Sequence, residues 1–149
     1  MMRFLPEPGP MTQPFWDGCA AGELRLQRCE ACAHWQFYPR LVCTSCGASA
    51  LVWEPASGNG VLRSFTIVRR PVTEAYAAEV PYVIALIALA EGPTLMSQLV
   101  EVDLGAKDAH AQGIVIGALV EVLFQPWSET ISMPMFRLRS SATVMSSQH

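Results

Sequence analysis

The sequence predicts a mainly β protein with a short N-terminal helix, a small cysteine-rich module and a five-stranded barrel. Three observations lead to this fold class. Four of the five cysteines lie within residues 29–46, as two C-x-x-C pairs. Five strand-like segments follow residue 58, separated by loops that carry proline or glycine. No long segment after that point has the 3.6-residue periodicity of an amphipathic helix.

The composition indicates a globular chain. Hydrophobic residues make up 51% of the 149 residues and charged residues 15%, with a net charge of -3. An acidic chain lacks the surplus of cations that nucleic acid binding requires. No apolar stretch approaches the roughly 20 residues that span a bilayer, and the N-terminus has no apolar core of a secretory signal. We therefore predict a cytoplasmic protein that binds neither nucleic acid nor a membrane.

Residues 1–22 are predicted to form an N-terminal extension and a short helix. Pro14 suits the first turn of a helix, and Gly22 is a residue type that ends one. Phe15, Trp16 and Cys19 fall at helical spacing. We expect Phe15 and Cys19 to pack in the core, whereas Trp16 suits a core position and a partner surface equally well.

Residues 23–56 are predicted to form a zinc ribbon. Strand-like segments at 23–28 and 50–54 flank Cys29, Cys32, Cys43 and Cys46. Two C-x-x-C turns bring four thiolates around one ion and leave no open position, which is a structural geometry. Gly47 suits the turn after the second pair, whereas Ala33 departs from that pattern after the first.

The identity of the metal stays open at this point. A cytosolic setting disfavours disulfides, and two neighbouring pairs favour a metal over a redox dithiol. Structural Zn²⁺ is the first expectation, and iron in a rubredoxin-like site is the alternative because thiolates accept both metals. Four sulfurs already fill the site, so we expect His34 to be an ordinary loop residue.

Residues 57–139 are predicted to form an OB-fold. The strand-like segments cover residues 61–70, 82–90, 94–102, 119–125 and 131–139, the last interrupted by Pro134. Five short strands in about 80 residues match the size of this barrel. Residues 140–149 (SSATVMSSQH) are predicted to be a flexible tail.

The sequence contains no recognisable catalytic motif. None of the three histidines has a companion nucleophile or carboxylate in a known arrangement. We expect Glu91, between two predicted strands, to be a solvated carboxylate in a turn. The absence of a catalytic motif favours a binding or structural role over that of a self-sufficient enzyme.

The order of these motifs resembles a family of small bacterial and archaeal proteins. The resemblance covers about residues 14–139 and rests on six segments: PFWDGCAAGELRLQRCEAC, FYPRLVCTSCG, GNGVLRSFTIVRRP, PYVIALIALAEGPTLMSQLV, IGALVEVLFQ and MPMFRLR. That family, often catalogued as a domain of unknown function, joins a rubredoxin-like zinc ribbon to an acyl-CoA-associated OB-fold. Ala33 stands where the family often has glycine.

The resemblance implies a non-catalytic subunit in a hetero-oligomer. Members accompany a thiolase-like protein, and in some cases a hotdog-fold enoyl-CoA hydratase. The partner then carries out condensation, acyl transfer or aldol cleavage, and this chain bridges subunits and helps to bind acyl-CoA.

Candidate contact residues for such a partner or for CoA are aromatic residues and arginines: Phe15, Trp16, Phe37, Arg40, Arg69, Arg70, Arg137 and Arg139. For any single arginine, a solvated position at a strand edge is the simpler expectation.

Two other function classes fit parts of the sequence. OB-folds bind single-stranded nucleic acid through basic grooves and stacking aromatics, but the acidic charge and an aromatic content of 9% disfavour that function. A rubredoxin-like iron site would make the chain an electron carrier, which leaves the large barrel unexplained.

Overall fold

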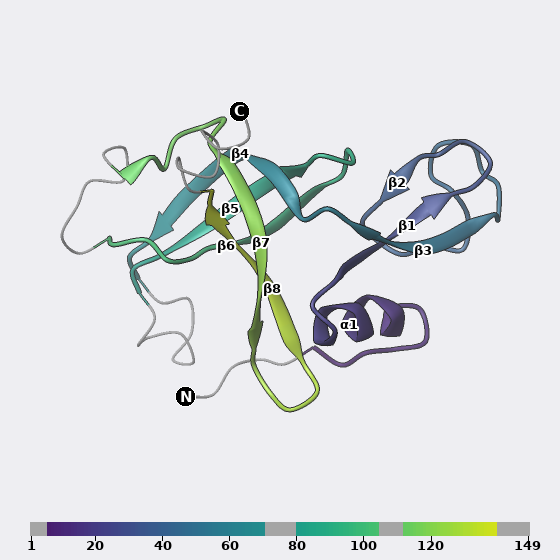
Figure 1. Cartoon of the computed structure of the whole chain (residues 1–149), viewed down its shortest axis with the longest axis horizontal. Helices are drawn as coiled ribbons and strands as arrows, with labels where there is room; N and C mark the ends of the chain where they lie inside the picture. The colour runs from purple at the N-terminus through teal and green to yellow at the C-terminus, as the bar shows by residue number, and fades with distance from the viewer. Residues whose placement is uncertain (1–5, 71–79, 105–111, 140–149) are drawn as a thin grey trace, which may run out of the picture.

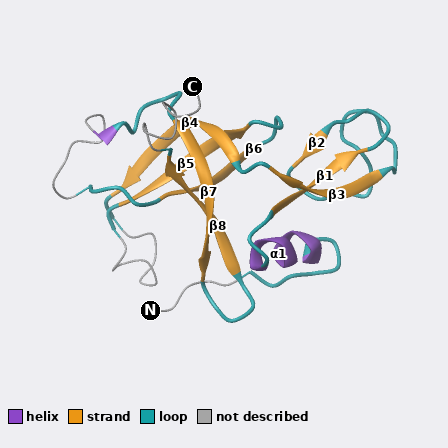
Figure 2. Cartoon of the chain, viewed as in Figure 1, coloured by secondary structure: helices purple, strands orange, loops and turns teal. Residues whose placement is uncertain are grey.

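The structure, a computed structural model, describes residues 6–70, 80–104 and 112–139 and confirms the predicted fold class (Figures 1 and 2). It contains one short α-helix, a three-stranded sheet and a closed five-stranded barrel. The elements are α1 (Gln13–Ala20), β1 (Leu24–Cys29), β2 (Trp35–Gln36), β3 (Leu51–Ala56), β4 (Asn59–Val68), β5 (Tyr82–Leu89), β6 (Thr94–Leu99), β7 (Leu119–Pro126) and β8 (Ser132–Leu138).

Helix α1 forms where the proline and glycine signals place it. Proline lies in its first turn, where the missing N–H costs no helical hydrogen bond. Gly22 follows the helix with a φ of 79°, a conformation that glycine adopts without steric cost. The buried face carries Phe15, Gly18 and Cys19.

The small sheet has the order β2-β1-β3, and all its strands are antiparallel. Strand β1 is central, and both of its faces are buried. Leu24 and Leu26 lie on one face, while Gln27 and Cys29 lie on the other. The two-residue strand β2 was not predicted, because so short a segment carries no periodic signal.

The barrel closes in the order β4-β5-β6-β8-β7. Strand β5 alternates strictly, with Val83, Ala85, Ile87 and Leu89 buried. Strand β4 pairs with β7 at Gly60↔Val120 and so closes the ring. Strands β6 and β8 run parallel, and among the described residues they are bridged only at Leu99↔Phe136. A meander of three strands closed through two more is the OB-fold arrangement.

Strand β8 continues through Pro134, which we had expected to interrupt it. Phe136 presents its carbonyl oxygen towards β6, where it accepts a hydrogen bond of 2.8 Å from the Val100 N–H. Backbone groups two residues apart in a strand face the same edge, so the nitrogen of Pro134 also faces β6. The missing N–H therefore falls outside the pairing of β8 with β7.

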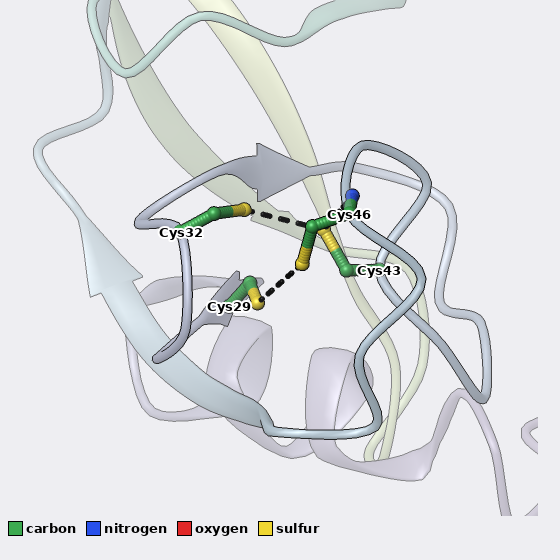
Figure 3. A group of neighbouring side chains, drawn as sticks. All are labelled: Cys29, Cys32, Cys43 and Cys46. Carbon is green, nitrogen blue, oxygen red and sulfur yellow. Dashed lines mark hydrogen bonds between the residues drawn. The ribbon is translucent and has the colours of Figure 1, made fainter.

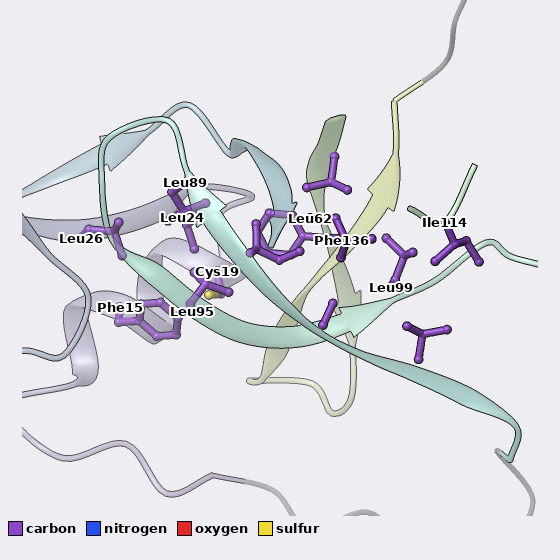
Figure 4. Packing of buried hydrophobic residues seen from close by; sticks show 14 residues of the cluster. Phe15, Cys19, Leu24, Leu26, Leu62, Leu89, Leu95, Leu99, Ile114 and Phe136 are labelled. Atoms are coloured by element: carbon purple, nitrogen blue, oxygen red, sulfur yellow. The ribbon is translucent and has the colours of Figure 1, made fainter. Parts of the chain in front are cut away.

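One continuous core joins the helix, the first strand of the small sheet and the barrel (Figure 4). Phe15, Cys19 and Leu24 pack in the same buried cluster as Leu62 and Phe136. The prediction of core positions for Phe15 and Cys19 is confirmed. Burial raises the pKa of the Cys19 thiol to about 12, so this thiol stays protonated.

Glu91 lies in a turn as expected, but the prediction that its carboxylate is solvated was wrong. Its Oε2 accepts a 2.8 Å hydrogen bond from the Ser57 N–H, and its Oε1 is buried with no hydrogen-bond partner among the described residues. The carboxylate therefore ties the turn between β5 and β6 to the segment that joins β3 to β4.

The predicted tail at residues 140–149 and the first five residues of the predicted extension lie outside the described residues. In the described part of the chain, no helix has the length and apolar character needed to cross a membrane.

Replacing Gly60 tests the close approach of β4 to β5. A Cβ at this position would lie 2.7 Å from the Ala88 carbonyl oxygen, where the backbones of β4 and β5 meet closely. We expect Gly60→Ala to lower the free energy of unfolding by about 1–3 kcal/mol, as overpacking does. Gly9→Ala, which meets nothing within 4 Å, serves as the control. Denaturant unfolding measures both, and equal stability of the two variants would contradict the close approach.

Candidate metal centre and apolar groove

Four cysteine side chains converge at one end of the small sheet (Figure 3). The Sγ atoms of Cys29, Cys32, Cys43 and Cys46 all lie within 4.8 Å of one another. The Cys29–Cys46 and Cys32–Cys43 pairs are each 3.6 Å apart. Sulfurs at about 2.3 Å from one tetrahedral ion stand roughly 3.8 Å apart. The four cysteines therefore form a metal site of the zinc-ribbon type.

The two C-x-x-C turns, which we call the knuckle turns, have similar backbone geometry: one runs from Cys29 to Ala33 and the other from Cys43 to Gly47. Ala33 N–H donates to the Cys29 carbonyl, and Gly47 N–H donates to the Cys43 carbonyl, at 2.8 Å and 2.9 Å. Ala33 and Gly47 both have positive φ angles, of 66° and 77°. Alanine thus occupies a left-handed position that favours glycine, and the first turn keeps its form at a cost in strain.

Hydrogen bonds favour ionisation of Cys43. The backbone N–H groups of Cys46 and Ser45 point at the Cys43 sulfur and lower the pKa of this thiol to about 6. The hydrogen bond from the His34 backbone N–H lowers the pKa of Cys32, but desolvation and the three neighbouring cysteines outweigh it and raise the pKa to about 12. Four crowded thiolates need a cation to coexist, so this donor set fits a thiophilic divalent ion.

Gln27 and Gln36 form a buried pair that sequence reasoning missed. Gln36 Nε2 donates to Gln27 Oε1 at 2.8 Å, and Gln27 exchanges two hydrogen bonds with the backbone of Arg40. Gln36 Oε1 accepts from the backbone and the hydroxyl of Thr44. The pair fixes the inter-knuckle loop, residues 37–42, against β1. Glutamines at exposed-looking positions of a strand gave no signal of this role.

The structure brings together only the aromatic members of the predicted contact set. Phe15 contacts Trp16 and Phe37 edge to face, with ring centroids 4.9 Å and 5.8 Å apart. Arg40 lies on the inter-knuckle loop, with its guanidinium 6.0 Å from the Tyr38 ring centroid.

The other four arginines lie on the barrel or directly after its strands. Arg69 and Arg70 are exposed, just after β4. Arg137 lies 3.5 Å from a Glu101 oxygen and 3.7 Å from a Glu121 oxygen. Arg139 follows β8 and is half-buried.

An apolar groove of about 450 Å³ runs beside the aromatic group. Its walls come from α1, the inter-knuckle loop, β5, β6, β8 and the segment between β7 and β8. Aromatic and methionine side chains dominate the lining, among them Trp16, Phe37, Met96, Trp127 and Met133. None of the described residues that line it is charged. The sequence gave only a weak signal of the groove, the Met-Pro-Met run of β8.

The inter-knuckle loop exposes large apolar side chains. Tyr38 is 71% exposed, Leu41 78% and Val42 47%. We call these three exposed residues of the loop the ribbon tip. Clustered apolar side chains on a surface mark contact sites more often than isolated ones do.

Comparison with known proteins places the chain in a family. The model of the ChsH2 rubredoxin-like zinc ribbon domain matches residues 16–52, and the model of the ChsH2 C-terminal OB-fold domain matches residues 53–125. A DUF35 domain-containing scaffold protein of Methanothermobacter thermautotrophicus is 30% identical over 99 residues, which are 66% of this chain and 68% of the relative. The chain belongs to the DUF35 family, with the domains of ChsH2. It is a scaffold-type member with a zinc ribbon.

Two further relatives share part of their length with the chain. A DUF35 domain-containing scaffold protein of Pyrococcus furiosus is 36% identical over 51% of this chain and 54% of its own length. A probable enoyl-CoA hydratase alpha subunit of Thermomonospora curvata is 32% identical over 83% of this chain. The chain covers only 36% of that relative's length.

Two solved structures have the same fold. The chain is similar to one in a structure described as the Ltp2-ChsH2(DUF35) aldolase, with a TM-score of 0.74 and 26% identity over 90% of this chain and 98% of that one. A DUF35 protein of unknown function from Sulfolobus solfataricus matches with a TM-score of 0.56 and 19% identity, over 88% of this chain and 87% of that one. The second match shows the fold alone.

Removal of one ligand tests the metal centre. We expect wild-type protein, purified under reducing conditions, to hold about one metal ion per chain. Cys43→Ser removes one of four sulfurs and should lower the metal content to well below half. Cys19→Ala, at the one cysteine outside the cluster, should keep it. Elemental analysis by mass spectrometry measures the ratio, and full metal content in Cys43→Ser would refute the assignment.

Substitutions in the two knuckle turns should change the stability of the ribbon in opposite directions. Ala33→Gly relieves the strain of a left-handed alanine and should raise the stability of the ribbon by about 1 kcal/mol. Gly47→Ala should lower it by a similar amount, because a Cβ there meets nothing within 4 Å and only the φ of 77° opposes it. Release of metal to a chelator as denaturant rises reports both. Shifts in the same direction would show that backbone strain does not decide the stability of these turns.

Proposed function

We propose that this protein is a non-catalytic subunit that binds and supports a thiolase-like acyl-CoA enzyme, which catalyses condensation, acyl transfer or aldol cleavage. One observation carries the proposal: the likeness to the ChsH2 chain of an aldolase extends over 98% of that chain. The names of the DUF35 scaffold relatives support a supporting role over a catalytic one. The protein acts in the cytoplasm as part of a hetero-oligomer.

The closed metal centre supports the non-catalytic part of the proposal. Four sulfurs complete a tetrahedron and leave no coordination position for substrate. The ion is structural Zn²⁺, which the match to the zinc ribbon domain favours over iron. Elemental analysis and the absence of the red colour of an iron–sulfur site distinguish the two metals.

Exposed apolar side chains support a protein partner. Besides the ribbon tip, the barrel exposes Val61, Ile116 and Leu119, of which Val61 and Leu119 are paired across β4 and β7. Single exposed apolar residues are common on soluble proteins, but clusters mark contact sites. A thiolase-like subunit is the first candidate. The name of the Thermomonospora curvata relative supports a hotdog-fold enoyl-CoA hydratase as the second.

A contact with CoA is a finer part of the same proposal. Arg69 and Arg70 are adjacent in the sequence and both exposed, and guanidinium groups suit bidentate pairing with CoA phosphates. Arg137 suits this role less, because Glu101 and Glu121 already lie beside its guanidinium.

Affinity purification of the chain, tagged in its own host, tests the proposal. We expect a thiolase-like or hydratase-like subunit to co-purify in a near-stoichiometric amount. Leu41→Glu places a charge on the ribbon tip and should weaken retention of the partner at least about tenfold, the effect of burying one unpaired charge. Ala50→Glu adds the same charge at another exposed position of the ribbon and is the control.

One result would contradict the proposal: a tagged chain that elutes without an acyl-CoA enzyme, alone or with nucleic acid. Equal retention of the partner by wild-type protein and Leu41→Glu would remove the ribbon tip from the interface and leave the subunit role in place.

A further inference from the structure

Strands β6 and β8 are neighbours in the barrel, but they pair at a single position of the described chain, near the end of β6. Strand β5 pairs with β6 from Thr94 to Leu99, and β7 pairs with β8 along the whole of β8. Between β6 and β8, however, the described residues contain a single bridge, Leu99↔Phe136. The second edge of β6, over residues 94–98, therefore has no strand partner in the described part of the chain.

The backbone of β6 has hydrogen-bonding groups that face this edge. The Val100 N–H donates to the Phe136 carbonyl on β8 at 2.8 Å. Because alternate residues of a strand direct their backbone groups to the same edge, Gln98, Met96 and Thr94 face the same way as Val100. Unpaired groups of this kind are a template for another strand.

Pro134 explains why β8 does not supply that strand. Its nitrogen faces β6 but carries no hydrogen, so it donates nothing to the neighbouring strand. The Ser97 hydroxyl fills part of the gap by donating to the Pro134 carbonyl at 2.8 Å. The Ser97 side chain thus replaces a backbone hydrogen bond between β6 and β8, and the two strands diverge at this point.

The apolar groove lies along the same edge. Met96, which is 68% exposed, lines it from β6, and Met133 and Pro134 line it from β8. Methionine side chains adapt their shape to different apolar partners. Because no charged residue among the described ones lines the groove, a segment that enters it should be uncharged as well.

The groove continues towards the ribbon tip. A second hollow of about 220 Å³ shares Phe15, Trp16 and Phe37 with the first. The rings of Phe37 and Tyr38 are in contact, with centroids 5.6 Å apart. A segment lying in the groove would therefore reach the surface that the proposed function assigns to the partner.

We propose that an extended, uncharged segment of the partner subunit adds to the free edge of β6 as a further strand. This inference rests on the proposed function, since the partner supplies the segment. Five residues of β6 give an edge about 16 Å long. A polypeptide pairs with the regularly spaced backbone groups of β6 and places every second side chain in the groove. An acyl chain would fill the groove but leave those backbone groups without partners.

Hydrogen exchange on the purified complex tests the strand addition. In the free chain the amides of Met96 and Gln98 should exchange rapidly. In the complex with the co-purified subunit, strand pairing should slow their exchange at least about 100-fold, as for stable sheet hydrogen bonds. Amides of β5 bonded within the barrel should change little and serve as the internal reference.

Two variants at Met96 distinguish the loss of a backbone hydrogen bond from the loss of a side-chain contact. Met96→Ala and Met96→Pro both remove the methionine side chain, but only proline also removes the N–H at the free edge. We expect Met96→Pro to bind the partner about tenfold more weakly than Met96→Ala, the cost of one hydrogen bond. Proline is tolerated on an unpaired edge, and an unchanged metal content confirms that the variant is folded.

The outcomes separate this inference from the proposed function. Slower exchange in the complex together with the tenfold difference supports the strand addition. If the partner co-purifies but the two amides exchange at the free rate, or if both variants bind equally, the strand addition is overturned and the proposed function stands. Protection already present in the free chain would show that the chain covers its own edge and would also overturn it. If no partner co-purifies, both proposals fail together.

Discussion

The constraint on which the rest of the structure depends is the burial of β1 on both faces. Leu24 and Leu26 on one face belong to the core shared with α1 and the barrel, while Gln27 and Cys29 on the other belong to the metal ribbon. A module of this size has too little apolar surface to fold on a core of its own and needs a metal or a larger neighbour. Strand β1 meets both needs. Its Cys29 belongs to the cysteine cluster, and its Leu24 and Leu26 pack into the core of the barrel. The ribbon is therefore held rigidly enough to form one wall of the apolar groove.

The polar groups around β1 extend this constraint to the surface. Gln27 holds the backbone of Arg40, and Gln36 holds Thr44, so the inter-knuckle loop follows the position of β1. Glu91 ties the β5–β6 turn to Ser57, where the chain passes from the ribbon into the barrel. The exposed Tyr38 and Leu41 thus stand on a fixed support. A surface presented in one conformation loses less entropy when it binds, which suits a scaffold.

Features that depend on local spacing were predictable from the sequence, and features assembled from distant segments were not. The cysteine pairs predict their metal site because the turn geometry fixes a three-residue spacing. The strict alternation of β5 likewise predicts a strand. The groove, in contrast, combines Phe15, Phe37, Met96 and Trp127 from four separate segments. Pro134 was singled out correctly but misread, since its effect depends on which edge its nitrogen faces. The pairing of Arg137 with Glu101 and Glu121 likewise requires the barrel to close first.

We propose that this chain supports the catalysis of another subunit and performs none alone. Acyl-CoA turnover is to be measured for the co-purified subunit, for this chain, and for the two recombined at equal molarity. We expect no turnover by the chain alone and a marked gain for the partner when the chain is restored with its metal in place. Turnover by the chain alone, or equal activity of the partner with and without it, would contradict this role.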